Sequence, residues 1–106
     1  MRPLTPTERL LVSRLAGDEV LDVDLFAIRA TPMQDGGMGS LRFETETVNP
    51  VRTRSLGEVQ FDDEDGVPVL VELTVDQEGR LFELDVWKTD FSPVRQWPNR
   101  ERLTAI

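Results

Sequence analysis

The sequence lacks the residues on which many protein sites depend. It contains no cysteine and no histidine, and Lys88 is its only lysine. Without cysteine, disulfide bridges, thiolate zinc sites and iron–sulfur clusters are excluded. Without histidine, the side chain that most often acts as a general base or binds metal near neutral pH is missing. We therefore predict no catalytic residue, no cofactor and no metal site.

Long apolar segments are missing as well. No run of about 18 apolar residues occurs, so we predict that the chain does not span a membrane. Polar residues follow Met1, Arg2 and Pro3, and this start does not resemble a secretory signal. We therefore expect a cytoplasmic protein. A chain of 106 residues predicts a single domain over residues 1–106, with residues 1–4 and 99–106 frayed.

Negative charge is abundant, and most of it lies in one segment. The net charge of the chain is −8. Residues 58–90 contain eleven acidic side chains against Arg80 and Lys88, so this segment carries −9 and the rest of the chain +1. An acidic surface repels nucleic acid and attracts basic proteins. We expect a basic protein partner, no nucleic acid and no membrane; the alternative is that the charge serves solubility alone.

Residues 5–16 have the features of an amphipathic helix. Thr5 is a favourable N-cap, Pro6 suits the first helical position and Glu8 completes a capping box. Gly17 is a typical residue just beyond a helix C-terminus. The apolar side chains form one stripe, which predicts a helix packed on the core. This stripe comprises Leu4, Leu11, Val12, Leu15 and Ala16.

Residues 26–45 have the pattern of a β-hairpin. A two-residue type I′ turn at Asp35-Gly36 would fix its register. The predicted cross-strand pairs are Ile28–Phe43, Ala30–Leu41 and Met33–Met38. Before the hairpin, residues 18–25 fit either a strand or a short helix. After it, residues 46–57 fit a loop, because they contain Pro50 and Gly57 and show little periodicity.

Residues 58–90 predict three antiparallel strands, at 58–61, 67–75 and 81–88. A four-residue turn over residues 76–79 would pair Leu73 with Phe82, and the loop over 62–66 would pair Phe61 with Val67. Both turns place apolar residues on one face, which we predict to be the core. This face comprises Val59, Phe61, Val67, Val69, Val71, Leu73, Val75, Phe82, Leu84 and Val86. The whole pattern predicts an α+β fold, with the N-terminal helix packed on an antiparallel sheet of four to six strands built from hairpins.

The opposite face of this meander combines carboxylates with large apolar side chains, Leu81 among them. The predicted register puts Glu72 across from Glu83 and Leu70 beside Asp85. Like charges directly opposite each other are mildly destabilising, whereas apolar anchors surrounded by charge are typical of protein interfaces. We therefore predict a partner-binding face. Its residues are Leu70, Glu72, Glu83, Asp85 and Trp87.

Two other arrangements would leave this face without a partner. Arg29 and Arg42, which the first hairpin places opposite each other, could neutralise the carboxylates if both hairpins joined one sheet. The tail, residues 91–97, could instead cover the face with Val94 and Trp97. The sequence leaves these alternatives open.

Three segments resemble sites of known chemistry only in part. FDDEDG (61–66) is as acidic as a calcium loop but has Phe61 where such loops need an oxygen ligand. DGGMGS (35–40) is glycine-rich but lacks the Gly-Lys-Ser/Thr ending of a phosphate loop. Paired carboxylates on a flat sheet form a poor catalytic pocket, so we do not expect an enzyme. We expect Lys88 to form a local salt bridge with Asp85 or Asp90.

The segments DGGMGSLRF (35–43) and ELDVWKTDFSPV (83–94) resemble a family of small uncharacterised bacterial proteins. This resemblance covers most of the chain and implies no activity or catalytic residue. In size, charge and architecture the chain also resembles immunity proteins of bacterial toxin systems, which implies an inhibitor that occludes a basic toxin. The alternative is a housekeeping or regulatory domain that self-associates, and the oligomeric state is open.

Overall fold

The computed structural model describes residues 1–17, 24–98 and 103–105. Most of the stretch 18–25, which fits either a strand or a helix, lies outside these residues. Short and long strands flank the helix along the chain. The elements are β1 (Arg2–Pro3), α1 (Pro6–Ala16), β2 (Arg29–Pro32), β3 (Leu41–Phe43), β4 (Arg54–Asp62), β5 (Pro68–Val75), β6 (Leu81–Lys88) and β7 (Thr104–Ala105).

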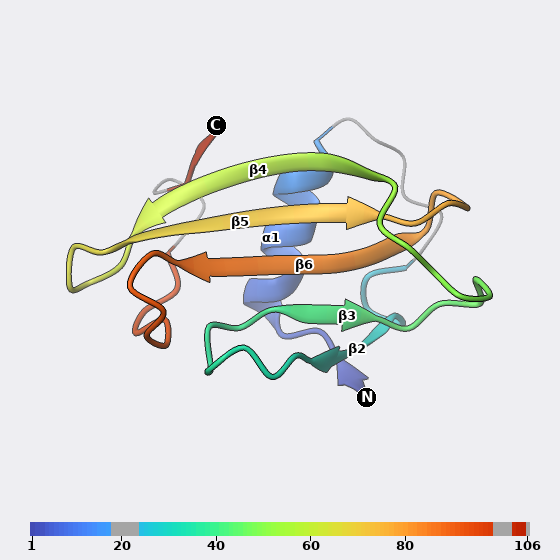
Figure 1. The fold of residues 1–106 in the computed structure, drawn as a ribbon, viewed down its shortest axis with the longest axis horizontal. Helices are drawn as coiled ribbons and strands as arrows, with labels where there is room; N and C mark the ends of the chain where they lie inside the picture. The colour runs from blue at the N-terminus through green and yellow to red at the C-terminus, as the bar shows by residue number, and fades with distance from the viewer. Residues whose placement is uncertain (18–23, 99–102, 106) are drawn as a thin grey trace.

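The fold has two layers, an antiparallel sheet and the helix α1, which crosses behind it (Figure 1). Within the described residues the sheet has seven strands in the order β1-β2-β3-β6-β5-β4-β7. Its five longer strands agree with the predicted four to six, and the two-residue strands β1 and β7 extend the two edges. The predicted α+β fold is confirmed.

The helix α1 begins and ends where the sequence indicates. The Thr5 hydroxyl accepts a hydrogen bond from the Glu8 backbone N–H (3.1 Å), and the Glu8 carboxylate accepts one from the Thr5 N–H (2.8 Å). Gly17 follows with a φ of 59°, which glycine adopts without strain. The helix lies close against the backbone of β4 at Gly57. A Cβ added to this glycine would come within 2.5 Å of the Leu15 carbonyl oxygen, so close packing requires glycine there.

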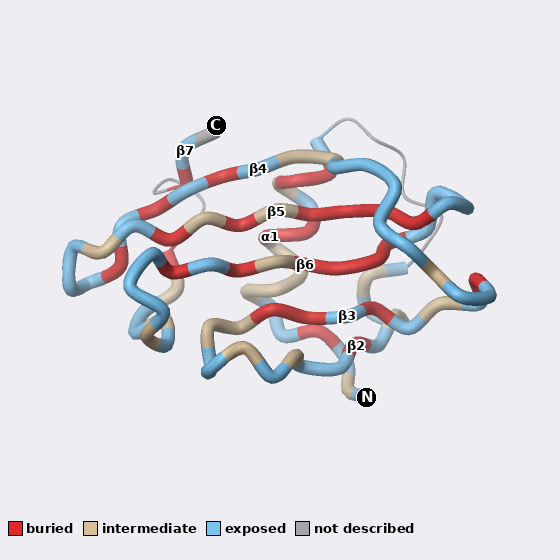
Figure 2. The backbone as a smooth tube through the Cα atoms, in the orientation of Figure 1, coloured by how far each residue is buried: buried red, intermediate tan, exposed pale blue. Residues whose placement is uncertain are grey.

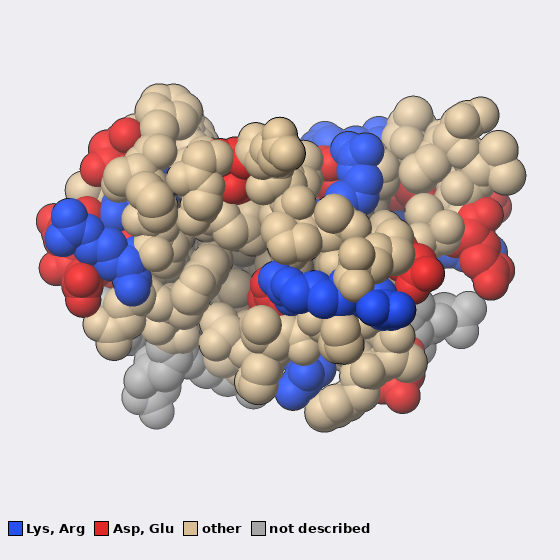
Figure 3. Space-filling model, turned by 90° about the horizontal axis from the view of Figure 1, so that it is seen from below, with Lys and Arg blue, Asp and Glu red and all other residues tan. Residues whose placement is uncertain are grey.

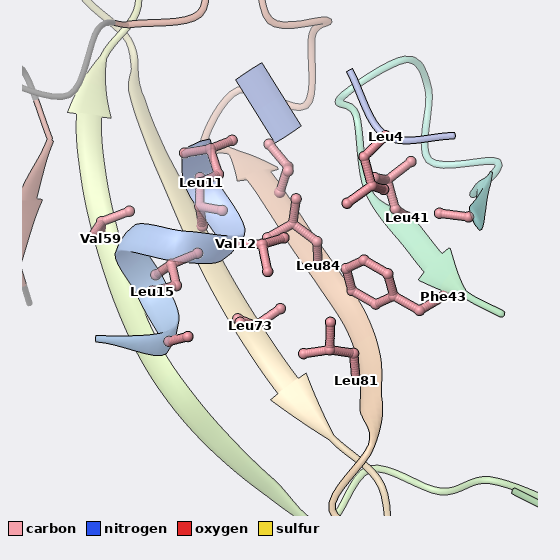
Figure 4. Close-up of a cluster of buried hydrophobic side chains, with 14 of the residues drawn as sticks. Leu4, Leu11, Val12, Leu15, Leu41, Phe43, Val59, Leu73, Leu81 and Leu84 are labelled. Atoms are coloured by element: carbon pink, nitrogen blue, oxygen red, sulfur yellow. The ribbon is translucent and has the colours of Figure 1, made fainter. Parts of the chain in front are cut away.

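The core lies between α1 and the inner face of the sheet (Figure 4), and buried residues are concentrated along the central strands (Figure 2). Full burial of each large apolar side chain stabilises the fold by roughly 1.5–3 kcal/mol relative to exposure. Of the predicted strand positions, all but Val67 and Phe82 belong to this core. All residues of the predicted helical stripe, including Leu4, belong to this core as well.

β4, β5 and β6 form the predicted meander, but β3 lies beside β6 and not beside β4. This arrangement is a Greek key, in which a long connection joins strands that are not neighbours. The connection, residues 44–53, is held at the β5–β6 turn by Gln77. The Gln77 side chain accepts a hydrogen bond from the Val51 N–H (2.9 Å) and donates one to the Asn49 carbonyl (3.0 Å). Because β3 joins β6, Arg42 pairs with Glu83.

The predicted registers of both hairpins in the meander are wrong by two residues. Phe61 pairs with Val69, and Val71 pairs with Val86. Both turns have the sequence Asp-X-X-Gly and the same hydrogen bonds. The Asp63 N–H donates to the Val67 carbonyl and the glycine N–H donates to the Asp63 carbonyl, and Asp76 repeats this pattern. Each loop has three residues, ends in a glycine with a positive φ and is shorter than the predicted loop. In β5–β6 the shorter loop shifts the pairing by one residue, and a β-bulge shifts it by a second.

A β-bulge near the start of β6 changes two further predictions. The register shifts by one residue between the pairs Leu73–Leu84 and Val75–Leu81. Phe82 and Glu83 therefore both lie opposite Thr74, whose hydroxyl accepts from the Glu83 N–H (3.3 Å) and donates to the Glu83 carbonyl (3.2 Å). A bulge of this kind redirects side chains. Leu81 consequently enters the core cluster, contrary to the prediction, whereas Phe82 is buried but lies outside that cluster.

The loop between β2 and β3 is longer than the predicted two-residue turn, so this register is also wrong by two residues. The observed pairs are Ala30–Phe43, Thr31–Arg42 and Pro32–Leu41. The Asp35 carboxylate organises the loop by accepting hydrogen bonds from the backbone N–H groups of Met38 (3.1 Å) and Ser40 (2.8 Å). An aspartate that satisfies several backbone donors in this way makes a wide turn stable.

Strand pairing extends toward both ends of the chain. β1 pairs with β2, and the following residue, Leu4, is buried. β7 pairs with β4, and Leu103 is buried. The sequence predicts fraying over residues 1–4 and 99–106; of these, 99–102 and 106 lie outside the described residues. No helix in the described parts of the chain combines the length and apolar character needed to cross a membrane.

Candidate partner-binding face

The sheet face opposite α1 carries the predicted partner-binding residues, and we call its part on β4, β5 and β6 the outer face. Its side chains are Glu58, Gln60, Leu70, Glu72, Phe82, Glu83, Asp85 and Trp87. Glu72 pairs with Asp85, not with Glu83 as predicted, and Leu70 pairs with Trp87, not with Asp85. Glu58 pairs with Glu72 on the other side. Three carboxylates therefore stand in one row across the three strands.

Arginines from outside these strands neutralise two of the carboxylates. The Arg42 guanidinium pairs with Glu83, with its Nε donating over 3.0 Å. Arg52, in the connection between β3 and β4, donates to both oxygens of Glu72 at 3.0 and 3.1 Å. The alternative in which arginines compensate the acidic face thus holds for Arg42. It does not hold for Arg29, which donates to the Met1 carbonyl (2.8 Å).

The row of carboxylates has uneven proton affinities. Burial raises the pKa of Asp85, and the charges of Glu83 and Glu72 raise it further. A hydrogen bond and charge repulsion from Glu72 raise the pKa of Glu58. Burial also acts to raise the pKa of Glu72, but hydrogen bonds with Glu58, Arg52 and Ser55 outweigh it and lower that pKa. Asp85 is therefore the half-buried acid whose negative charge is least compensated.

Apolar side chains lie next to this row and are open to solvent. Trp87 is 48% exposed and Phe91 67% exposed, and their ring centroids are 6.3 Å apart. Trp87 also borders a hollow of about 260 Å³ together with Glu58, Leu70, Val71, Glu72 and Asp85. Phe91 and Glu58 were not among the predicted partner-binding residues. Glu58 lies on the outer face by the same alternation as Glu72, so the sequence pattern could have indicated it as a partner-binding residue.

The tail does not cover this part of the face. Val94 and Trp97 pack against the core cluster, and the Trp97 ring lies 5.9 Å from that of Phe61. Trp97 also lies close to Gly39, where an added Cβ would come within 2.8 Å of its ring. The second alternative, in which residues 91–97 cover the acidic face, therefore does not hold for these side chains.

Lys88 forms a buried ion network, and the expected salt bridge with Asp85 or Asp90 is wrong. Its side chain is fully buried, and its Nζ donates to Asp63 (2.9 Å) and Asp65 (2.7 Å). Asp63 also accepts hydrogen bonds from the backbone N–H groups of Arg95 (2.7 Å) and Gln96 (3.0 Å). The network therefore ties the end of β6 and the β4–β5 turn to the tail.

Positive and negative side chains are mixed on the edge of the sheet, and the described carboxylates form no metal site. Viewed from the edge at β2, basic side chains lie across the middle and at one end, with acidic side chains beside them and at both ends (Figure 3). In the described part of the chain, no group of three or more Asp, Glu, His or Cys side chains is placed to hold a metal ion. Aligned carboxylates beside an exposed indole instead suit organic cations such as arginine or lysine side chains.

Comparison with known proteins places the chain in a family. A family model described as Domain of unknown function (DUF6984) matches residues 1–98. No curated protein and no solved structure matches the chain. The match covers α1, all strands from β1 to β6 and the tail segment that contacts Lys88. The chain therefore belongs to the DUF6984 family of domains of unknown function.

Proposed function

We propose that this chain is a protein-binding domain whose outer face docks on a basic partner. One observation carries the proposal: Trp87 is half exposed beside the carboxylate row of Glu58, Glu72 and Asp85. Tryptophan is enriched among residues that dominate binding energy. Carboxylates around such an anchor attract a basic protein and orient it before contact.

The most concrete form of this proposal is a cytoplasmic immunity or antitoxin-like inhibitor. A toxin that acts on nucleic acid or another anionic substrate has a basic active-site surface. The carboxylates of the outer face would occupy that surface in place of the substrate, and Trp87 and Leu70 would provide apolar anchoring. The small size and the net charge of −8 support this form. The inhibition would need no catalytic residue in this chain.

The test begins with affinity purification of the tagged protein from its native host and identification of the bound protein. Binding kinetics are then measured at two salt concentrations for the wild type and for D85K, E58K and W87A. We expect association to slow at higher salt and in both charge reversals, because screening weakens long-range attraction. We expect W87A to dissociate at least about tenfold faster, since loss of an anchor acts mainly on the off-rate.

A matched control and two outcomes make this test decisive. E78K reverses an exposed charge in the β5–β6 turn, away from Trp87, and should retain most of the association rate. Unchanged kinetics in all the outer-face variants would place the interface elsewhere, with Arg52 and the adjoining Arg54 at the start of β4 the next surface to examine. A second copy of this chain as the bound protein, with dimers dispersed by W87A in sedimentation, would replace the basic partner by self-association.

A further inference from the structure

One end of β6 contains an internal example of arginine recognition. The Arg42 guanidinium lies 5.0 Å from the centroid of the Phe82 ring, and its Nε donates to the Glu83 carboxylate over 3.0 Å. An aromatic ring and a carboxylate both attract this flat cation. Because Arg42 comes from β3, the fold itself supplies the arginine at this end of the strand.

The other end of β6 presents the same two kinds of side chain. Asp85 and Trp87 are two residues apart on one strand, so they lie on the same face. Among the described residues, no lysine or arginine forms an ion pair with Asp85. The nearest cations, Arg52 and Arg42, pair with Glu72 and Glu83 instead.

The hollow beside these side chains has the size for one side chain of a partner. Its volume of about 260 Å³ lies below the roughly 300–1,000 Å³ of pockets that enclose drug-sized ligands. Leu70 contributes an apolar wall and Glu58 adds negative charge, whereas Glu72 is paired with Arg52. An apolar wall, an indole and a carboxylate match the aliphatic stem and the planar cation of arginine.

We infer that the hollow bounded by Asp85, Trp87 and Leu70 binds an arginine side chain of the basic partner. This inference rests on the proposed function and specifies what the outer face recognises. The guanidinium stacks on Trp87 and donates hydrogen bonds to Asp85, as Arg42 does with Phe82 and Glu83. Arginine is favoured over lysine, because stacking and paired hydrogen bonds both require a planar, delocalised cation.

The experiment follows the indole N–H signals of ¹⁵N-labelled protein in NMR spectra while a short peptide is added. The probe is Ac-Gly-Arg-Gly-NH₂, and W87F assigns the two indole signals. The Trp87 signal should shift with saturation, and the Trp97 signal, from a ring packed on Phe61, should not. The same peptide with citrulline, which keeps the shape but has no charge, should bind at least about tenfold more weakly, and the lysine peptide about threefold more weakly.

A pair of charge-matched variants locates the site. D85N should weaken arginine-peptide binding by about fivefold or more, whereas E78Q, which removes one negative charge from the β5–β6 turn, should change it by less than about twofold. Equal shifts with the citrulline or lysine peptide, or equal effects of D85N and E78Q, would overturn the inference.

The two proposals fail in different ways. Partner binding that W87A weakens and D85N leaves intact would overturn the arginine site but keep the proposed function. Partner binding that no outer-face variant alters would overturn the proposed function, while the peptide titration would still decide whether the hollow recognises arginine.

Discussion

Asp63 and Asp85 are both withdrawn from water, yet their surroundings differ. Asp63 is buried and accepts hydrogen bonds from Lys88 and from the backbone N–H groups of Glu64, Arg95 and Gln96. Burial alone would raise the pKa of Asp63, but these donors hold it far below its usual value of 3.8. The pKa of Asp85 is instead raised, by burial and by neighbouring acids. The first carboxylate stabilises the fold, and the second is the one that we propose for binding a partner.

The largest expected effect comes from breaking the buried network. Replacing Lys88→Met removes the charge that compensates Asp63 and Asp65, and breaking a buried pair from one side is strongly destabilising. We expect the melting temperature to fall by about 10–20 °C. Calorimetry of the variant measures this. D90N is the matched control, because Asp90 accepts hydrogen bonds from Ser92 near the surface, and it should melt within about 2 °C of the wild type. A larger loss in D90N than in K88M would restore the local salt bridge predicted from the sequence.

A smaller effect, with a defined pH dependence, is expected for Asp63→Asn. The lowered pKa of Asp63 means that its stabilisation is present above its usual titration range and is lost as pH falls toward its folded pKa. At pH 7 the variant should melt about 5–10 °C below the wild type. The difference should narrow as pH falls below 4, because the unfolded wild-type chain then binds a proton at this carboxyl while the folded chain does not. Urea unfolding at pH 7, 5, 4 and 3 checks this; a constant difference would assign the effect to packing.

For Asp85 on the outer face, the effect of the Asn substitution on stability at neutral pH should have the opposite sign. Because the pKa of Asp85 is raised in the folded state, its charge opposes folding at neutral pH, and that penalty disappears as pH falls below its usual range. Asp85→Asn should raise the melting temperature at pH 7 by about 2–4 °C, as removal of an unfavourable cross-strand charge pair allows. The gain should vanish near pH 3. Destabilisation by D85N at pH 7 would show that Asp85 has a structural partner.

The smallest effect on stability is expected for Phe91→Ala. Phe91 is largely exposed and its main aromatic neighbour is Trp87, so the melting temperature should change by less than about 2 °C. The purified partner should nevertheless dissociate faster, because this ring extends the apolar part of the proposed interface. Calorimetry and binding kinetics on the same preparation separate the effect on stability from the effect on partner dissociation. A large fall in melting temperature would make Phe91 part of the core.

The sequence predicts the faces of the sheet better than its register. Alternation places Val59, Val71 and Leu84 inside, and a shift of two residues leaves every side chain on its face. The pattern therefore cannot distinguish the predicted registers from the observed ones. That distinction depends on turns such as Asp63–Gly66, where an aspartate and a left-handed glycine close a loop that is shorter than the predicted one. The helix, by contrast, follows from local signals at Thr5 and Glu8 that need no distant partner.

The sequence also predicts the candidate site only in part, because alternation determines the face of a side chain but not its partner on a neighbouring strand. Alternation brings Leu70, Glu72, Asp85 and Trp87 to one face, but the partners of Glu83 and Lys88 depend on contacts far apart in sequence. Arg42 reaches Glu83 only because the Greek key places β3 beside β6. Lys88 continues the inward alternation of Leu84 and Val86, and this signal could have indicated a buried lysine with acidic partners.

The burial of Lys88 has a practical consequence for identifying what binds this protein. The chain has one lysine, and its side chain has no solvent exposure in the folded state. Reagents that link lysine to lysine would therefore find no lysine side chain on its surface, even in a tight complex. Carbodiimide coupling, which joins carboxylates to amines, would instead use its abundant surface acids and the lysines of a basic neighbour. Such a reagent would join this protein's carboxylates to the other protein's lysines, whereas no lysine side chain of this protein would react in return.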